Sequence, residues 1–213
     1  SSTAATRVLT LTVILPPVPA VVFSGLPQTL PPGTQSIITL NLAQPFPIPV
    51  TGTLTLIFES SAANGADDPA IQFSTGGRRV TFTIPAGSTV AVFSEAQLRL
   101  LTGTVAGTIR IQTSTSPASA APVPDVVITI PRSVPVITSG TAQLSATSFT
   151  ITLNGYSNTR EISAGTFRLT PAAGSNLAAT DVPVSVGTFF ADYYRSPAAI
   201  PFGGQFQLVV PFN

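Results

Sequence analysis

The apolar positions of this chain recur at every second residue over most of its length. In the segments 52–58 (GTLTLIF) and 78–84 (RRVTFTI), large apolar side chains alternate mostly with polar ones, which gives each segment one apolar face and predicts a strand. Proline or glycine interrupts the pattern about every eight to twelve residues, as in all-β sandwiches. The helical period is nearly absent, and only Ser94–Leu101 suits a helical turn or an irregular connection.

The predicted strands form two groups, separated by a stiff linker at Pro131–Pro135. The first group comprises segments 7–15, 20–24, 36–42, 52–58, 78–84, 88–94, 104–112 and 126–130. The second group comprises segments 134–138, 141–145, 148–154, 166–170, 182–186, 188–194 and 205–212. We therefore expect an all-β protein with two tandem Ig-like β-sandwich domains, at residues 20–131 and 132–213, of which the second is the smaller. Residues 1–19 precede them as an extended strand and a proline-rich spacer.

Two segments carry more specific expectations. The run of Ser, Ala and Pro at Thr113–Pro124 has low complexity and predicts a loop or hairpin tip. In segment 148–154, Phe149, Ile151 and Leu153 share one face, so we expect them inside the second domain.

Segment 7–15 (RVLTLTVIL) has one face that is fully apolar. The apolar face carries Leu9, Leu11, Val13 and Leu15. The opposite face carries Val8, Thr10, Thr12 and Ile14. Such a strand needs a surface that covers it. The prolines that follow lack amide donors, so they should hold the strand apart from the sandwich that begins near Val21. The candidate residues of an assembly strand, which pairs within its own chain or with a neighbouring copy, are Val8, Leu9, Leu11, Val13 and Leu15.

The chain carries few charges. Charged residues make up 8% of it and hydrophobic residues 44%, and its net charge of +1 gives copies little mutual repulsion, which favours association. All nine basic residues are arginines, scattered except for Arg78–Arg79, so the sequence does not predict a nucleic-acid partner. The charge-free stretch Val8–Phe58 is interrupted by prolines, so no membrane span is predicted.

The residue types that are missing exclude most enzyme mechanisms. The chain has no Cys, His or Lys, and therefore lacks hydrolase triads, Schiff-base lysines and P-loops. It also lacks the usual ligands of zinc, haem and iron–sulfur sites. We predict no enzyme activity, no catalytic residue, no metal site and no cofactor. Because the chain also has no Met, we expect that an N-terminal segment, most commonly a secretory signal, has been removed.

Carboxylates are the remaining candidates for chemistry. Glu59 and Asp67–Asp68 lie in a loop rich in Gly, Ala and Asn, and such oxygens are the ligands that calcium takes, about six to eight at a time. The alternative, which we favour, is a solvated turn whose Asp side chains cap nearby amides. Neighbouring residues on one loop do not face each other across a cleft, as a glycosidase pair must. We expect Arg78–Arg79 and Arg160–Glu161 to be solvated surface charges.

Aromatic residues cluster in segment 188–194. In a strand, Phe189 and Tyr193 would share one face and Phe190 and Tyr194 the other, so one set is expected in the core. The other set is a candidate contact with another subunit or with a carbohydrate. Phe190, Tyr193 and Tyr194 are therefore candidate interface residues.

Two stretches resemble repeat domains of known families. TLTVILPPVPAVVFSGLP followed by LPPGTQSIITLNL is similar to the boundary between bacterial Ig-like or fibronectin-III-like repeats. GGRRVTFTIPAGSTVAVF is similar to a hairpin of Calx-beta-like repeats in large secreted surface proteins. The resemblance covers about residues 8–130 and implies an extracellular sandwich used for adhesion, spacing or assembly. Calcium-binding Calx-beta domains carry more acidic loop residues than this chain does.

Two functional hypotheses follow. The first is a structural subunit of an extracellular, pilus-like filament at the cell surface, in which copies of the chain polymerise by donating the N-terminal strand to the next subunit. The second is a set of spacer or carbohydrate-binding modules of a larger secreted adhesin or enzyme, with surface glycans as candidate partners. In the second case, segment 7–15 is the last strand of a preceding repeat.

Overall fold

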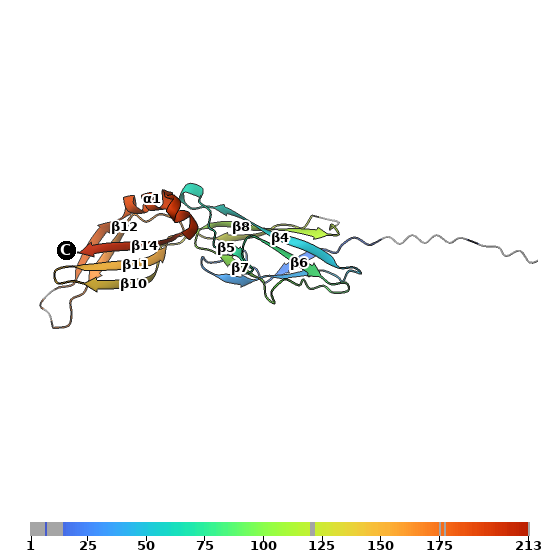
Figure 1. Cartoon of the computed structure of the whole chain (residues 1–213), viewed down its shortest axis with the longest axis horizontal. Helices are drawn as coiled ribbons and strands as arrows, with labels where there is room; N and C mark the ends of the chain where they lie inside the picture. Colours follow the sequence, from blue (N-terminus) through green and yellow to red (C-terminus); the bar gives the residue numbers. More distant parts are fainter. Residues whose placement is uncertain (1–6, 8–14, 120–121, 175, 177, 213) are drawn as a thin grey trace, which may run out of the picture.

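The structure is a computed structural model that describes residues 7, 15–119, 122–174, 176 and 178–212. It confirms the all-β expectation, because the described regular structure consists mostly of strands in several sheets and helices are few. Figure 1 shows an elongated molecule in which the strands of residues 21–130 and those of residues 136–212 lie end to end. We call these parts the N-terminal region (15–132) and the C-terminal region (133–212).

The described residues of the N-terminal region form three sheets. The largest, in the order β6-β4-β8-β9, comprises β4 (Val50–Ser60), β6 (Arg79–Ile84), β8 (Gly107–Ser116) and β9 (Val126–Ile130). The second, in the order β2-β7-β5, comprises β2 (Gln35–Ile37), β5 (Ile71–Phe73) and β7 (Arg99–Thr102). The third pairs β1 (Val21–Ser24) with β3 (Thr39–Leu42). A short 3-10 helix, η1 (Ala63–Gly65), follows β4.

The N-terminal region has one continuous apolar core. In β6, burial alternates strictly, with Val80, Phe82 and Ile84 buried, as the period of two predicts. Leu54 of β4 and Ile109 of β8 are fully buried in the same core. The core therefore explains why this alternation recurs from strand to strand.

Three segments of the N-terminal region differ from expectation. The strand predicted at 36–42 is two strands, β2 and β3, which are separated at Ile38. Segment 88–94 makes only two isolated bridges instead of a strand. Ser94–Leu101 forms no helical turn but is an irregular connection that leads into β7.

The described residues of the C-terminal region form two sheets and an α-helix. The three-stranded sheet, in the order β10-β11-β14, comprises β10 (Val136–Leu144), β11 (Phe149–Tyr156) and β14 (Gln205–Phe212). The two-stranded sheet pairs β12 (Ala164–Leu169) with β13 (Thr180–Ser185). The helix α1 (Gly187–Arg195) and the 3-10 helix η2 (Pro197–Phe202) connect β13 to β14. No described helix is both long and apolar enough to cross a membrane.

The strands predicted at 134–138 and 141–145 are one strand, β10, with a bulge between Ile137 and Ser139. Its partner β11 runs antiparallel to it, so that Val136 lies opposite the end of β11 and Leu144 opposite its beginning. β10 therefore extends along the full length of the sheet.

The strand predicted at 188–194 is wrong, because this segment is the helix α1. Phe190 and Tyr194 lie four residues apart, which places them on one face of a helix as well as on one face of a strand. Both are buried in a small core that comprises Val186, Phe190, Tyr194, Ala199 and Phe206.

Phe149, Ile151 and Leu153 are only half-buried, as are the polar residues between them, so the expectation that these three would be enclosed in a core is wrong. The inner face of β11 is thus incompletely covered.

The two regions meet through hydrogen bonds that we call the junction. The Ala106 amide donates to the Asn158 carbonyl (2.9 Å), and the Gly204 amide donates to the Thr104 hydroxyl (2.9 Å). β8 begins next to the junction and β11 ends next to it, so both long strands run along the axis of the molecule.

Candidate functional site

β10 is an edge strand without charge or proline. It pairs only with β11 among the described strands, so its other side presents main-chain N–H and C=O groups to solvent. All nine of its residues are exposed. The three-stranded sheet as a whole contains no Asp, Glu or Arg. Such an edge is a template for the addition of another strand.

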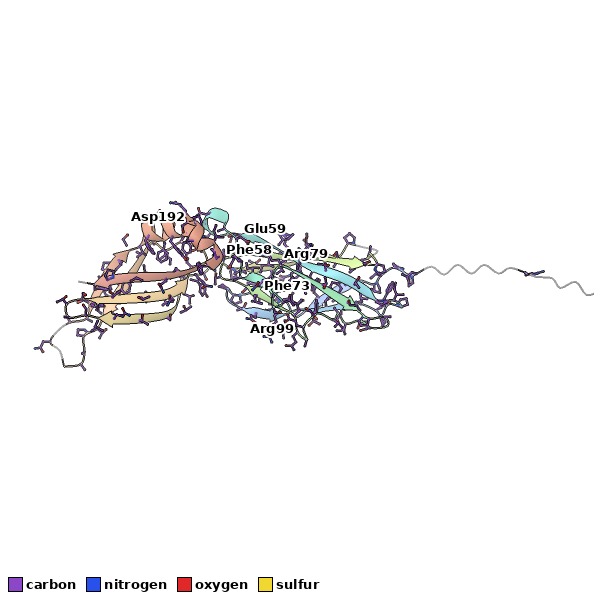
Figure 2. The ribbon with its side chains drawn as sticks, in the orientation of Figure 1. Phe58, Glu59, Phe73, Arg79, Arg99 and Asp192 are labelled. Carbon is purple, nitrogen blue, oxygen red and sulfur yellow. The ribbon has the colours of Figure 1, made fainter. Side chains whose placement is uncertain are left out.

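The other edge strands of the C-terminal region, and β9 of the N-terminal region, carry features that oppose strand addition. The C-terminal region has them at Pro211 in β14, Arg168 in β12, and Asp181 and Pro183 in β13. β9 of the N-terminal region is also free of charge, but Thr129 in this strand bonds with Gln28 (2.8 Å) and Leu30 (3.0 Å) of its own chain. Figure 2 shows charged side chains elsewhere, such as Glu59 and Arg99 on the N-terminal region.

An apolar groove of about 450 Å³ lies between the three-stranded sheet and β12. It is lined by Ile137 of β10, Ile151 and Leu153 of β11, Phe167 of β12 and Leu208 of β14. We call this space the groove. It explains why the inner face of β11 is only half-buried.

A second hollow, of about 680 Å³, lies at the other end of the same strands, beside Phe149 and Leu169. The uncovered space therefore extends along the C-terminal region and is not confined to one end.

Small residues lie on two of the strands that border the groove, β10 and β12. On the inner face of β10, Gly140 and Ala142 lie opposite Leu153 and Ile151. At Gly165 of β12, which lines the groove, an added Cβ would meet no atom within 4 Å. Apolar side chains of β10 are exposed, with 53% for Ile137, which lines the groove, and 85% for Leu144 at the end of the strand. Exposed apolar surface beside a groove is a candidate site for contact with another protein or a ligand.

The candidate assembly residues Val8, Leu9, Leu11 and Val13 lie outside the described residues. Leu15 is described and is 43% exposed. Shortly after it, Val18 bridges Ser119 at the tip between β8 and β9. Because β8 begins at the junction and ends at this tip, the chain enters the N-terminal region at the end opposite to the groove (Figure 1).

Phe190 and Tyr194 are not available to a partner, so their assignment as candidate interface residues is wrong. They are 1% and 2% exposed within their own chain. Tyr193 is half-buried, and its hydroxyl donates to the Gln205 carbonyl (3.1 Å). Burial raises the pKa of Tyr193 and of Tyr194.

A polar hollow of about 680 Å³ lies on the outer face of the three-stranded sheet. Its lining combines the amides of Asn154, Gln205 and Gln207 with the rings of Tyr193 and Phe202, and it includes no charged side chain. Phe202 is 54% exposed. Aromatic rings beside neutral amides form a surface suited to an uncharged polar ligand.

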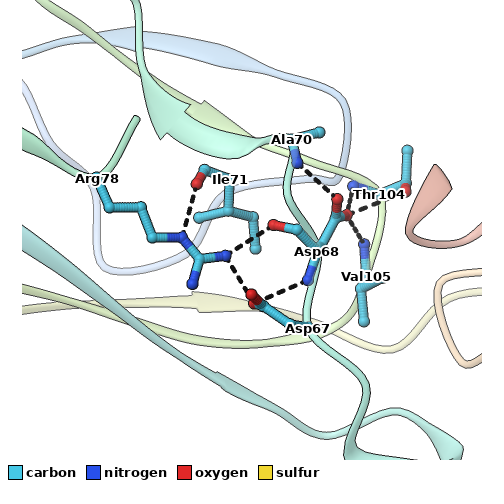
Figure 3. A network of polar contacts seen from close by, with 7 residues as sticks. All are labelled: Asp67, Asp68, Ala70, Ile71, Arg78, Thr104 and Val105. Atoms are coloured by element: carbon cyan, nitrogen blue, oxygen red, sulfur yellow. Dashed lines mark hydrogen bonds and ion pairs between the residues drawn. The ribbon is translucent and has the colours of Figure 1, made fainter. Parts of the chain in front are cut away.

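The sequence did not predict a buried polar cluster at the junction. Asp68, expected in a solvated turn, is 1% exposed. Figure 3 shows that its carboxylate accepts hydrogen bonds from the backbone amides of Ala70 (2.9 Å), Thr104 (2.6 Å) and Val105 (3.0 Å). The Thr104 hydroxyl also donates to Asp68 (3.1 Å) while it accepts from Gly204. Asp68 thus caps amides, as expected, but holds the two regions together from the interior.

The loop carboxylates do not form a common site. Asp67 is exposed and pairs with Arg78 (2.6 Å), whereas Glu59 lies near Arg110 (3.4 Å). Among the described residues, no group of three or more His, Cys, Asp or Glu side chains is arranged to hold a metal ion. The oxygens of Asp68 face N–H donors, an arrangement that does not suit a cation.

Arg160 is buried, which corrects the expectation of a surface charge. It is 2% exposed, donates to the Tyr194 carbonyl (2.6 Å) and lies 5.0 Å from the centre of the Tyr194 ring. Desolvation lowers the pKa of its guanidinium. Glu161 is exposed and pairs with Arg132 (3.0 Å). Arg160 therefore stabilises α1 next to the junction.

No family model, curated protein or solved structure matches the chain.

Proposed function

We propose that this protein is a non-enzymatic structural subunit of an extracellular, cell-surface filament, in which the N-terminal strand of each copy adds to the C-terminal region of the next. The observation that carries the proposal is the free, uncharged edge of β10 beside the groove. A strand added there would pair with the exposed main chain, and its apolar face would cover the groove.

The reach of the N-terminal segment supports donation to another copy. Nine extended residues, 7–15, span at most about 32 Å. β8 alone, with ten residues, spans about 33 Å from the junction to the tip near Val18. Segment 7–15 is therefore too short to reach the groove of its own copy. The groove of a copy placed end to end would lie next to the segment.

The energy of such a contact is large beside the stability of a domain. Each buried Leu or Val side chain of segment 7–15 contributes about 1.5–3 kcal/mol before ordering costs. Each added sheet hydrogen bond contributes about 1 kcal/mol net. Typical domain stability is about 5–15 kcal/mol, so the acceptor region would gain much of its stability from the donated strand.

The contact joins two different surfaces of the same chain. Repeated head-to-tail contacts form a closed ring only when the rotation between neighbouring copies returns to the first copy. Otherwise they produce an open fibre, as proposed here. The resemblance of residues 8–130 to Ig-like, fibronectin-III-like and Calx-beta-like repeats agrees with a secreted, Ig-like architecture.

Deletion of residues 1–15 tests the proposal. We expect electron microscopy and sedimentation to show filaments for the full chain and none for this truncation. Deletion of residues 1–6 alone, which keeps segment 7–15, is the matched control and should leave filaments intact. The peptide RVLTLTVIL, added in trans to the truncation, should raise its melting temperature without restoring polymer. Filaments that persist without residues 1–15 would refute the proposal.

The uncharged hollow beside Phe202 favours a second candidate function, the binding of a surface glycan. A sugar ring stacks on an exposed aromatic side chain while amides bond its hydroxyls. Titration with neutral oligosaccharides should shift the NMR signals of Gln205 and Gln207, and Phe202→Ala should abolish the shifts. Equal shifts in Phe202→Ala and the unchanged chain would exclude this site.

A further inference from the structure

The direction of β10 restricts how a donated strand can lie. β10 begins opposite Tyr156, next to the junction, and ends at Leu144, opposite Phe149. It therefore runs away from the N-terminal region of its own copy (Figure 1). We call the end of the C-terminal region at Leu144 the free end.

A donated segment must enter the acceptor at this free end. In a head-to-tail row, the N-terminal region of the donor would follow the free end of the acceptor. The donor's Val18 lies at the end of its N-terminal region that would face the acceptor. Residue 15 of the donor is thus nearest to the free end, and residue 8 is nearest to the acceptor's junction. Read from residue 8 to residue 15, the donated strand runs in the same direction as β10.

The side chains then define the register. The inner face of β10 carries Gly140, Ala142 and Leu144, at every second position. The apolar face of the donor carries Leu11, Val13 and Leu15 with the same spacing. Neighbouring residues of adjacent strands point to the same face, so the large donor side chains would lie on the inner side of the sheet, beside small acceptor residues and towards the groove.

We propose that residues 8–15 of one copy lie parallel to β10 of the next, with Leu11 beside Gly140, Val13 beside Ala142 and Leu15 beside Leu144. This inference rests on the proposed function and adds the occupant, direction and register of the groove. Leu9 then lies at the groove end lined by Ile137.

The outer face agrees with this register. Ser139 and Thr141 of β10 point outward, since Ser139 bonds the outward-facing Asn154 (3.0 Å) and Thr141 lies opposite Thr152. The proposed register places Thr10 beside Ser139 and Thr12 beside Thr141. Polar side chains therefore meet on the solvent side while apolar ones meet inside.

Disulfide cross-linking tests the register directly, because the chain has no Cys. Laterally adjacent residues of paired strands lie about 4.8 Å apart, within the range of a disulfide. The full chain with Thr12→Cys and Thr141→Cys should give a covalent ladder of multimers on a denaturing gel after oxidation. The matched control, Thr12→Cys with Gln143→Cys, moves one partner by two residues, to about 8 Å, and should give at least tenfold less ladder.

The outcomes separate this inference from the proposed function. Filaments whose cross-links prefer Gln143, or form with neither residue, would overturn the register and leave strand donation in place. A cross-linked monomer would show pairing within the chain and overturn both. The absence of filaments from the unmodified chain would overturn the proposed function itself.

A variant that fills the groove provides an independent test. Gly165→Leu projects a side chain into the open space beside β12, where an added Cβ meets no atom within 4 Å. We expect this variant to fold, with an unchanged or raised melting temperature, and to lose the covalent ladder of the Thr12 and Thr141 cysteine chain. Ala173→Leu, on an exposed loop outside the groove, should keep it. A folded Gly165→Leu chain that still cross-links would overturn occupation of the groove.

Discussion

Asp68 should be the most sensitive charged residue of the protein. Asp68→Asn preserves the shape of the side chain but converts one acceptor oxygen into an NH₂ donor. If that NH₂ faces Ala70, one hydrogen bond is lost and two donors oppose each other; if it faces Thr104 and Val105, three bonds are lost. Hydrogen bonds to charged groups contribute about 1.5–3 kcal/mol, and an unsatisfied buried donor costs about 1–3 kcal/mol. Even the better orientation should lower the free energy of unfolding by about 3 kcal/mol.

Urea denaturation followed by two signals measures this effect. The chain has no Trp, and its three tyrosines, Tyr156, Tyr193 and Tyr194, all lie in the C-terminal region, so tyrosine fluorescence reports on that region alone. Far-ultraviolet circular dichroism reports on both regions. Because Asp68 is linked to Gly204 through Thr104, we expect Asp68→Asn to lower the midpoint of both signals.

Asp67→Asn is the matched control, since it makes the same change at the preceding residue. The Asp67 side chain is 56% exposed and pairs with Arg78, and surface pairs contribute at most about 1 kcal/mol. If the free energies of unfolding of the two variants differ by less than about 0.5 kcal/mol, the hydrogen bonds of buried Asp68 do not stabilise the protein as described here.

Three further predictions concern ions, pH and backbone packing. Calcium should leave the melting temperature unchanged against a chelator control, because the oxygens of Asp68 already accept from amides. Burial raises the pKa of Tyr193 and Tyr194 above the unfolded value of about 10, so the stability they contribute is present below about pH 10 and is lost as the pH rises through the folded values. Urea midpoints and phenolate absorbance should show this loss, and a free energy of unfolding that stays constant into this range would contradict it. Gly155→Ala should cost about 1–3 kcal/mol in urea denaturation, because its Cβ would collide with the β10 backbone, whereas Gly165→Ala should change the stability by less than about 0.5 kcal/mol.

The sequence predicted strands well where one face packs on a core. Alternation placed β4, β6, β9, β11 and β14 close to their observed bounds. It missed β5, because three residues are too few to show a period. It assigned α1 to a strand, because Phe190 and Tyr194 share a face in either structure. Hydrophobic periodicity therefore does not identify strands as short as β5, and a spacing of four residues does not distinguish a helix such as α1 from a strand.

The candidate site was only half predictable. The apolar face of segment 7–15 is a local property of the sequence, so the sequence alone predicts a candidate donor strand, most of which lies outside the described residues. The acceptor was not, because whether β10 lies at an edge depends on the order of strands in a sheet. The burial of Asp68 was missed for a similar reason, since the amides that it caps at Thr104 and Val105 lie 36 and 37 residues away.

Head-to-tail assembly, as proposed, gives the junction a mechanical role. In a row of subunits joined in series, tension enters at Leu15, crosses the N-terminal region and the junction, and leaves through the groove. The exposed Arg132–Glu161 pair near the junction contributes at most about 1 kcal/mol. The hydrogen bonds from Thr104 to Asp68 and from Gly204 to Thr104 are buried and thus shielded from solvent and salt. They should therefore stabilise the junction more than the Arg132–Glu161 pair does. In the proposed filament, the buried carboxylate of Asp68 would therefore bear load between the two regions, while the uncharged β10 edge would accept the next strand.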